Sequence, residues 1–204
     1  MVSKRLFYIG VRVSEEMQQL TQKEIGRKYS GIACWYDFMN GVFERMGLGR
    51  LRRELLRCAY GRVLEVGIGT GRNLKYYPTS CKIFGIDYTP EMLKKARKRA
   101  AYFERKIVLK RGDAQHLPFK KESFDTVVDT FCLCTYPDAM TALKEIKRVC
   151  KKDGQILLLE HGKSSYAFVE RLQQWREKKH YQSMGCRLRM NHEALAKKAK
   201  LKVI

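Results

Sequence analysis

A glycine-rich turn between a predicted strand and a predicted helix limits what this chain can fold into. The turn reads VLEVGIGTG over 63–71, and a second apolar segment, KIFGIDY over 82–88, places Asp87 near its end. Glycine tolerates the dihedral angles of a sharp strand-to-helix reversal, and its missing side chain lets a ligand approach the backbone. Open α/β sheets bind nucleosides at such turns. Asp87 is placed to accept hydrogen bonds from both ribose hydroxyls.

The spacing of the glycines distinguishes between nucleoside cofactors. A dinucleotide site has the pattern G-x-G-x-x-G, whereas Gly67, Gly69 and Gly71 form G-x-G-x-G and are followed by Arg72. Glu65 lies just before the turn, where a carboxylate repels a pyrophosphate but attracts a cation. S-adenosylmethionine (SAM), with its sulfonium and ammonium groups, satisfies both conditions. The alternative is a tight turn that binds no ligand.

Further motifs extend this interpretation beyond the turn. The chain resembles the class I SAM-dependent methyltransferases over about 29–162, in the segments LEVGIGTG, GDAQHLPF, FDTVVDT and RVCKKDGQILLLEHG. Within that class it is similar to quinone-biosynthesis C-methyltransferases, through YDFMN over 36–40. The segments NLKYYP, LEHG and GCRLR also resemble thiol methyltransferases and a mitochondrial inner-membrane methyltransferase group.

The resemblance implies where the cofactor lies. It implies that Glu65 and the glycine turn hold the methionine part of SAM, and that Asp87 holds the ribose. It places Asp113 and Ala114 beside the adenine. The predicted lid contributes two further candidates for cofactor contacts, Tyr36 and Asp37.

Apolar segments that alternate with helical patterns predict a doubly wound, mostly parallel, Rossmann-like α/β sheet. The expected strands lie near Val63 and at 82–88, 107–109, 126–131 and 155–162. Residues 1–59 are expected to form an N-terminal arm and a helical lid, and residues 60–204 the SAM-binding core. The antiparallel hairpin that normally ends this fold is expected to be incomplete, because the chain stops where a sixth strand would start.

Side chains that cap helices predict where several helices begin. Ser14, Thr89, Asp138 and Asn191 are each placed to cap one. Gly154 is expected to end the helix that starts at Asp138. Breaks are expected in the lid helices at Gly47 and Gly49. A further helix is expected over 166–181, with apolar side chains on one face: Phe168, Leu172 and Trp175.

The strand at 155–162 is expected to lie at the edge of the sheet. An apolar edge strand is an aggregation hazard unless something covers it. We therefore expect either a protein partner or residues 164–186 to cover this edge.

The charge balance predicts a polyanionic partner. The chain has 42 Lys and Arg against 21 Asp and Glu, a net charge of +21. Such an excess destabilises a compact chain by self-repulsion, and a bound polyanion offsets it. RNA or a ribonucleoprotein is the predicted partner, ahead of an anionic membrane or no partner. No apolar run is long enough to be a transmembrane segment.

The first residues carry a targeting-like pattern. Residues 1–14 contain Lys4, Arg5 and Arg12 among apolar residues and no acid. This pattern is typical of organellar transit segments, although an ordered basic arm has the same composition. The mitochondrial matrix is the predicted location.

The cysteines predict no metal site. There are seven, an odd number, and none forms a C-x-x-C pair. Small buried hydrophobes are the preferred interpretation over a disulfide framework, a metal site or a redox role. Cys132 and Cys134 are expected on one face of a strand.

The sequence assigns no catalytic residue. Transfer of a methyl group from SAM is an in-line displacement, so the main requirement is alignment of the acceptor with the methyl group. A base is needed only when the acceptor must lose a proton. His161 is the first candidate for such a base and His116 the second, and for both a structural role is the simpler reading.

Three hypotheses for function remain open at this stage. The first is a SAM-dependent methyltransferase that is mitochondrial and works on RNA or a ribosomal particle, as the charge suggests. The second is a methyltransferase for a small molecule, a quinone precursor or thiol. It is favoured because DTFCLCT over 129–135 stands where base-methylating enzymes carry an Asn/Asp-Pro-Pro-aromatic motif. The third is a ribosome assembly or structural factor that binds SAM without turnover.

Overall fold

The computed structural model describes residues 19–202, apart from the side chains of Cys34, Met39 and Asn40. The predicted Ser14 cap and the transit-like residues 1–14 lie outside the described residues, as do the last two residues of the predicted sixth strand.

The described chain begins with helices. These are α1 (Gln22–Phe43), the π-helical turn η1 (Glu44–Leu48) and α2 (Gly49–Leu56). A capping box starts α1, because the Thr21 N–H donates to Glu24 at 2.8 Å and the Glu24 N–H donates to the Thr21 hydroxyl at 3.3 Å. Gly47 has a φ of 126° and kinks the chain between α1 and α2, as predicted. Gly49 is helical, so the second predicted break is wrong.

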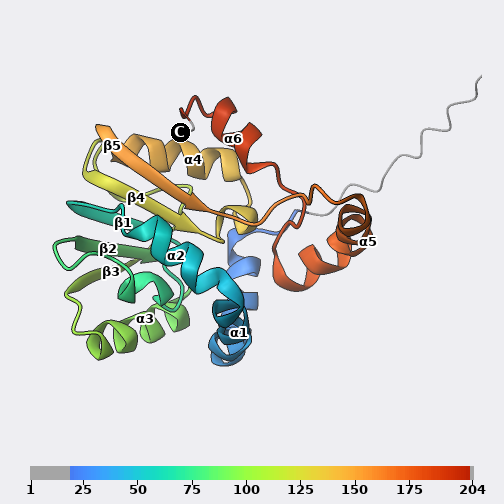
Figure 1. Cartoon of the computed structure of the whole chain (residues 1–204), viewed down its shortest axis with the longest axis horizontal. Helices are drawn as coiled ribbons and strands as arrows, with labels where there is room; N and C mark the ends of the chain where they lie inside the picture. Colours follow the sequence, from blue (N-terminus) through green and yellow to red (C-terminus); the bar gives the residue numbers. More distant parts are fainter. Residues whose placement is uncertain (1–18, 203–204) are drawn as a thin grey trace, which may run out of the picture.

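Five parallel strands follow, in the spatial order β3-β2-β1-β4-β5 (Figure 1). Their bounds are β1 Arg62–Val66, β2 Lys82–Asp87, β3 Ile107–Arg111, β4 Phe124–Thr130 and β5 Cys150–Leu159. The connections contain η2 (Arg72–Lys75), α3 (Pro90–Tyr102), η3 (Leu133–Thr135) and α4 (Ala139–Val149). The chain then forms α5 (Ala167–Met184) and α6 (His192–Lys198).

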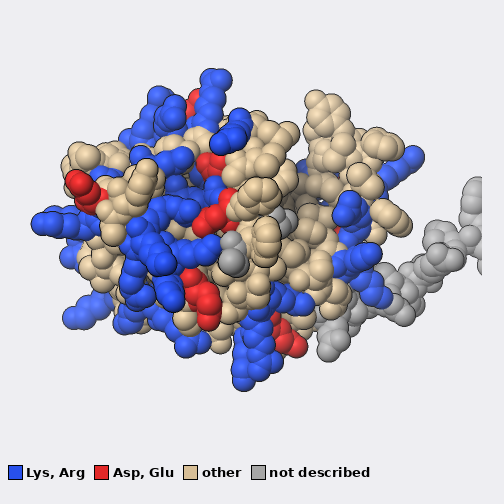
Figure 2. Space-filling model, turned by 90° about the horizontal axis from the view of Figure 1, so that it is seen from below, with Lys and Arg blue, Asp and Glu red and all other residues tan. Residues whose placement is uncertain are grey.

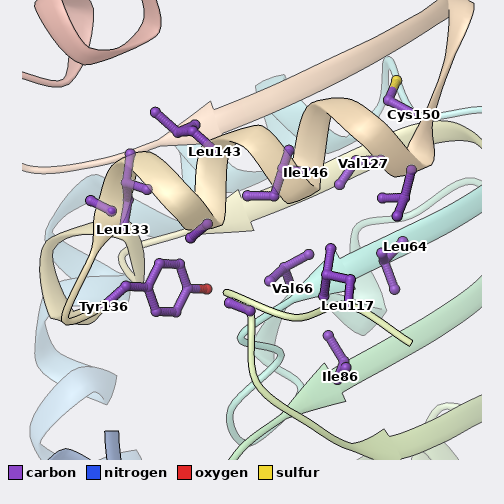
Figure 3. Packing of buried hydrophobic residues seen from close by; sticks show 14 of the residues in the cluster. Leu64, Val66, Ile86, Leu117, Val127, Leu133, Tyr136, Leu143, Ile146 and Cys150 are labelled. Carbon is purple, nitrogen blue, oxygen red and sulfur yellow. The ribbon is translucent and has the colours of Figure 1, made fainter. Parts of the chain in front are cut away.

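Helices cover both faces of the sheet, which confirms the doubly wound prediction. On one face α4 packs its buried residues Leu143 and Ile146 against Leu64 and Val127 of the strands (Figure 3). On the other face the buried residues of α2 and α3 pack with different strand side chains, in a second cluster that includes Leu56, Val63, Ile83, Leu93 and Val128.

The caps agree with the prediction for two helices. The Asp138 carboxylate accepts hydrogen bonds from the N–H groups of Met140 and Thr141, and Asn191 accepts one from Ala194. Thr89 occupies the N-cap position before Pro90, but its side chain makes no capping hydrogen bond.

Two local predictions near β4 and β5 are wrong. Gly154 does not end α4, because the helix stops at Val149 and Cys150 already pairs with Phe124 in the sheet. A Cβ on Gly154 would lie 2.7 Å from the carbonyl oxygen of Asp125, so glycine is needed here for close strand approach. Cys132 and Cys134 do not share a strand face, because β4 ends at Thr130 and Phe131 has a positive φ of 58°.

Strand β5 forms one edge of the described sheet. Helix α5 lies beyond the carboxyl end of β5, not alongside it (Figure 1). The segment instead meets the chain just past the strand, where Gln173 donates to the carbonyl oxygen of Gly162 at 3.0 Å. Coverage of the edge by residues 164–186 is therefore wrong, and coverage by a partner stays a prediction. No helix in residues 19–202 is long and apolar enough to cross a membrane.

Truncating a core leucine should measure how much the α4 face contributes to stability. Leu143 is fully buried, so Leu143→Ala should lower the free energy of unfolding by about 2–5 kcal/mol. Leu172→Ala, on the exposed face of α5, removes the same atoms and should change it by less than about 0.5 kcal/mol. Urea denaturation of both variants checks this, and equal losses would contradict the packing described.

Candidate functional site

A cavity opens at the carboxyl ends of β1, β2 and β4, between the sheet and α1. Its volume is about 830 Å³, counting the open mouth, which is within the roughly 300–1,000 Å³ of small-molecule pockets. The structure brings six of the predicted site residues to its lining: Tyr36, Glu65, Gly67, Gly69, Asp87 and Ala114. The other two, Gly71 and Asp113, do not line it.

The glycine turn forms one wall of the cavity. Gly67, Gly69 and Gly71 all have positive φ, at 65°, 55° and 77°. A Cβ on Gly67 would lie 2.5 Å from the Cys132 sulfur, whereas a Cβ on Gly69 would meet nothing closer than 3.9 Å. Gly69 therefore presents its backbone to open space. Gly71 faces away from the cavity, and a Cβ there would lie 3.2 Å from the backbone of Ala96 in α3.

Glu65 lies in the cavity lining and its side chain is fully buried. Its carboxylate accepts hydrogen bonds from the Asn73 amide at 2.8 Å and the Tyr77 hydroxyl at 2.9 Å. The Arg52 guanidinium donates to Asn73 Oδ1 at 2.7 Å and to the Thr130 hydroxyl at 3.0 Å. These bonds join α2, η2, β1 and β4 in the wall of the cavity.

Burial shifts the pKa of the Glu65 carboxyl group. Burial raises the pKa of Glu65 to about 7, against the opposing effects of the Tyr77 hydrogen bond and the Arg52 charge. Near neutral pH the carboxyl is therefore balanced between its neutral and ionised forms. A cation in the cavity favours the ionised form and lowers this pKa.

Asp87 is fixed by the backbone at the end of β2. Its carboxylate accepts hydrogen bonds from the N–H groups of Gly69 and Thr89, each at 2.8 Å. Burial raises the pKa of Asp87, and these backbone N–H groups oppose that rise. A carboxylate oxygen that accepts one hydrogen bond retains capacity for another, so Asp87 can still accept from a ligand.

The loop after β3 holds the next pair of predicted residues. Ala114 is buried and lines the cavity, as does Gly112. Asp113 instead accepts hydrogen bonds within its own loop, including one from the Gln115 N–H at 2.8 Å. Its role in the structure is to shape the loop that presents Ala114.

The two lid candidates have different environments. Tyr36 lines the cavity, and burial raises the pKa of its hydroxyl. Asp37 does not line it. The Asp37 carboxylate instead accepts from the Thr70 hydroxyl at 2.8 Å and forms ion pairs with Arg99 at 3.1 Å and Arg72 at 3.3 Å. Asp37 thereby connects α1 to the glycine turn and to α3.

Neither candidate base lines the cavity. His116 is exposed in the loop after β3. His161 follows β5 with its ring stacked on Phe131, which does line the cavity, at 6.4 Å between ring centroids. The His161 Nε2 atom lies 3.1 Å from the sulfur of Cys186.

A pair of carboxyl groups, of which Asp129 is buried and Glu160 half-buried, was not predicted. Asp129 lies one residue before the end of β4 and accepts a hydrogen bond from the hydroxyl of Tyr136, a cavity-lining residue, at 2.8 Å. Glu160 follows β5 and accepts from the N–H groups of Cys132 and Leu133 at 3.0 and 3.1 Å. Burial raises the pKa of both carboxyls, and the charge of Asp129 raises that of Glu160 further. The sequence signal that could have predicted this pair is an acidic residue near the end of each of two neighbouring strands, β4 and β5.

Comparisons with known proteins identify the family. Residues 64–158 match the family model described as a methyltransferase domain. A phosphatidylethanolamine N-methyltransferase from Cereibacter sphaeroides is 39% identical over 152 residues, which cover 72% of this chain and 74% of that protein. The chain belongs to the SAM-dependent methyltransferase family, and it is an enzyme of that class.

Other relatives share the same core. The mitochondrial methyltransferase OMS1 of Saccharomyces cerevisiae is 32% identical over 83% of this chain and 40% of its own length. A demethylmenaquinone methyltransferase from Lactobacillus johnsonii is 33% identical over 74% of this chain and 66% of its own. This chain thus spans less than half of the yeast protein and about two thirds of the bacterial one. A solved SAM-dependent methyltransferase from Thermotoga maritima is 26% identical, with a TM-score of 0.67 over 86% of this chain and 80% of that one.

The cavity fits the cofactor of the family. SAM carries cationic groups at its methionine end and a ribose at its centre, and the lining offers Glu65, Asp87 and the exposed backbone of Gly69. SAM is the cofactor, and when bound it supplies a methyl group on a sulfonium leaving group.

The pKa of Glu65 predicts that SAM affinity depends on pH. Because the ionised carboxylate attracts the cationic ligand and the neutral acid does not, affinity should rise as pH increases from about 5.5 to 8 and Glu65 ionises around a pKa of about 7. Calorimetric titrations across this range measure the dissociation constant and the protons released on binding.

Glu65→Gln is the matched control for this effect. It keeps the size and one acceptor oxygen but cannot ionise. The pH dependence should flatten to that of the ligand's own amino group, with affinity lower at pH 8. An unchanged profile in this variant would show that Glu65 is not the group that titrates.

Proposed function

We propose that this enzyme transfers the methyl group of SAM to a small amphiphilic molecule that it meets at an anionic lipid surface. The observation that carries the proposal is a set of large exposed apolar side chains on α1, which lines the cavity, and on α5, which contacts α1. The proposal deepens the small-molecule hypothesis and competes with the RNA hypothesis.

Within the cavity, we assign SAM an orientation from the groups that line it. Glu65 with the backbone of Gly67 and Gly69 would face the cationic methionine end, and Asp87 would accept from the ribose. Ala114 would pack beside the adenine. Gly71 and Asp113 act indirectly, through the packing of the turn and the shape of the loop.

Aromatic and apolar side chains on α1 and α5 support a lipid surface. Trp35 and Phe38 of α1 are 67% and 73% exposed, with their rings edge to face at 6.3 Å. On α5, Phe168 and Trp175 are 80% and 79% exposed. The two helices contact each other and lie together beyond the carboxyl edge of the sheet (Figure 1). Large exposed apolar patches mark interaction surfaces.

The charge of the molecule supports an anionic surface. Figure 2 shows Lys and Arg side chains spread over the face seen from below, while other residue types predominate over the part formed by α5. Basic groups near a membrane are attracted to anionic headgroups, at about 1 kcal/mol each. Basic residues beside exposed aromatic ones match the composition of a peripheral membrane contact.

The names of two relatives support an amphiphilic acceptor. One is called a phosphatidylethanolamine N-methyltransferase and the other a demethylmenaquinone methyltransferase. Both named acceptors combine a polar head with long hydrocarbon chains. The cavity lining has the mixed character that such a head would need, with Tyr29, Phe131 and Tyr136 beside the charged groups.

The RNA and assembly-factor hypotheses rest on net charge alone. An association with RNA or a ribonucleoprotein, and SAM binding without turnover, stay predictions. The mitochondrial matrix also stays a prediction, and its support is the word mitochondrial in the name of the yeast relative.

Removing the Asp87 carboxylate should weaken SAM binding. Loss of a charge-assisted hydrogen bond costs roughly 1.5–3 kcal/mol, so Asp87→Ala should raise the dissociation constant for SAM about 10- to 100-fold. Asp153→Ala removes an exposed acid after α4 and should leave it unchanged. Equal affinity in wild type and Asp87→Ala would disprove the proposed orientation.

Vesicle sedimentation tests the proposed surface. The enzyme should bind vesicles that contain phosphatidylglycerol and not vesicles of phosphatidylcholine alone. The double variants Trp35→Ser/Phe38→Ser and Phe168→Ser/Trp175→Ser should each bind at least about tenfold more weakly, because each loses the partial burial of two aromatic rings. Tyr60 is an exposed tyrosine just before β1, at the amino ends of the strands and away from the cavity. The variant Tyr60→Ser should therefore bind vesicles as the wild type does.

Methyl transfer identifies the class of acceptor. With SAM labelled in its methyl group, radioactivity should appear in the organic phase of a lipid extract and depend on the vesicle surface. Label in RNA, together with salt-sensitive RNA retention and no vesicle binding, would overturn the proposal in favour of the RNA hypothesis. SAM binding without any labelled product would favour the assembly-factor hypothesis.

A further inference from the structure

Three potential metal ligands converge outside the cavity, from segments far apart in the chain. They are Cys134 in η3, His161 after β5 and Cys186 after α5. One ligand atom from each lies within 4.8 Å of the other two. We propose that Cys134, His161 and Cys186 bind a Zn²⁺ ion that fastens the C-terminal segment to the carboxyl edge of the sheet.

The distances are close to those of a tetrahedral zinc site. The sulfurs of Cys134 and Cys186 are 3.5 Å apart, and His161 Nε2 lies 3.1 Å from the Cys186 sulfur. Zinc–sulfur bonds of about 2.3 Å and zinc–nitrogen bonds of about 2.0–2.1 Å place tetrahedral ligands roughly 3.8 and 3.6 Å apart. The sulfur–sulfur gap needs to widen by about 0.3 Å and the nitrogen–sulfur gap by about 0.5 Å, and the ligand atoms of Cys134 and His161 lie within 4.8 Å of each other.

The ligand types select zinc among the common ions. Two thiolates and one imidazole are soft and borderline donors, which suit Zn²⁺ and not Mg²⁺ or Ca²⁺. The thiol groups are buried and the imidazole is half-buried. The fourth position is open to water or to His180, whose ring approaches the Cys186 thiol without belonging to the cluster of three.

Hydrogen bonds already hold the segments that carry the ligands in contact with one another. The Arg187 N–H donates to the carbonyl oxygen of Cys134 at 3.1 Å, and its guanidinium donates to that of Tyr136 at 2.8 Å. His192 Nε2 lies 2.8 Å from the carbonyl oxygen of His161. A site held in this way requires little reorganisation to accept an ion, because the backbone positions are fixed.

The position of the site gives the ion a structural role. Cys186 follows Gly185, which ends α5 with a φ of 70° and packs against Ile25 of α1. Ile25 lines the SAM cavity. An ion bound at Cys186 would therefore hold the end of α5 and, through the contact between Gly185 and Ile25, the position of α1 over the cavity. None of the three ligands lines the cavity, so the ion would not contact a cofactor bound there.

Metal analysis of the purified full chain tests the proposal. Protein made with zinc in the medium and dialysed against buffer should contain about one Zn²⁺ per chain by mass spectrometry of the elements. Replacement by Co²⁺ should give the visible d–d bands of a tetrahedral ion together with a near-ultraviolet sulfur-to-cobalt charge-transfer band, and a site built only from oxygen and nitrogen ligands lacks the charge-transfer band.

Three cysteine variants complete the test. Cys134→Ala and Cys186→Ser should lose the zinc and the cobalt bands, while Cys58→Ser, a variant at an exposed free cysteine, should keep both. Removal of zinc should lower the melting temperature of the wild type, and added zinc should restore it only when both thiols are present. SAM binding is measured on the same samples, so that failure of the zinc site is seen separately from failure of the cofactor site.

Several outcomes would overturn the proposal. They are zinc well below one per chain in the wild type, zinc retained after Cys186→Ser, or a Cys134–Cys186 disulfide in fresh metal-free protein. The last outcome would assign the two thiols a redox role in place of a metal.

Discussion

The buried hydrogen bonds of Glu65 are the interaction on which the cofactor site depends. An acid without solvent must be satisfied by the protein, and here Asn73 and Tyr77 do so while Arg52 orients Asn73. Asn73 lies in η2, Tyr77 in the segment that follows it and Arg52 in α2, so the bonds that satisfy one carboxyl also fix where α2 and η2 meet β1. The same burial that makes these bonds necessary holds the pKa of Glu65 near the pH of the cell, where a cationic ligand can change its ionisation.

Much of the fold, and the main residues that line the cofactor cavity, could be predicted from local sequence. Alternating apolar segments predicted the sheet, because parallel strands buried on both faces are continuously apolar. The glycine spacing, Glu65 and Asp87 predicted the cofactor, because each acts within a few residues of its own strand. Arg52 and Asn73 were not predicted, since a polar residue in a helix acquires its role only when a distant strand is folded against it. For the same reason Asp37 was assigned to the cofactor, whereas Arg72, Arg99 and Thr70 bind its carboxylate.

The wrong placement of Cys132 and Cys134 on one strand face has a single physical origin. Phe131 adopts a left-handed conformation that ends the strand, and no pattern of apolar residues signals such a turn. It redirects Cys132 toward Gly67, where the sulfur lies 3.2 Å from the carbonyl oxygen of the glycine. It also turns η3 toward His161 and Cys186. The turn at Phe131 is thus followed at once by Cys132, which lines the cavity, and by Cys134, which belongs to the cluster outside it.

The contact between Leu20 and Tyr181 has a consequence for how the protein is made. The Leu20 N–H donates to the Tyr181 hydroxyl at 3.0 Å across a separation of 161 residues. On a ribosome that adds about 5–20 residues per second, the central strands emerge many seconds before this partner does. This contact at the start of α1 can therefore form only after residue 181 has been made. During synthesis the strands that form the sheet side of the cofactor cavity are therefore present before the contact that anchors the start of α1 can form.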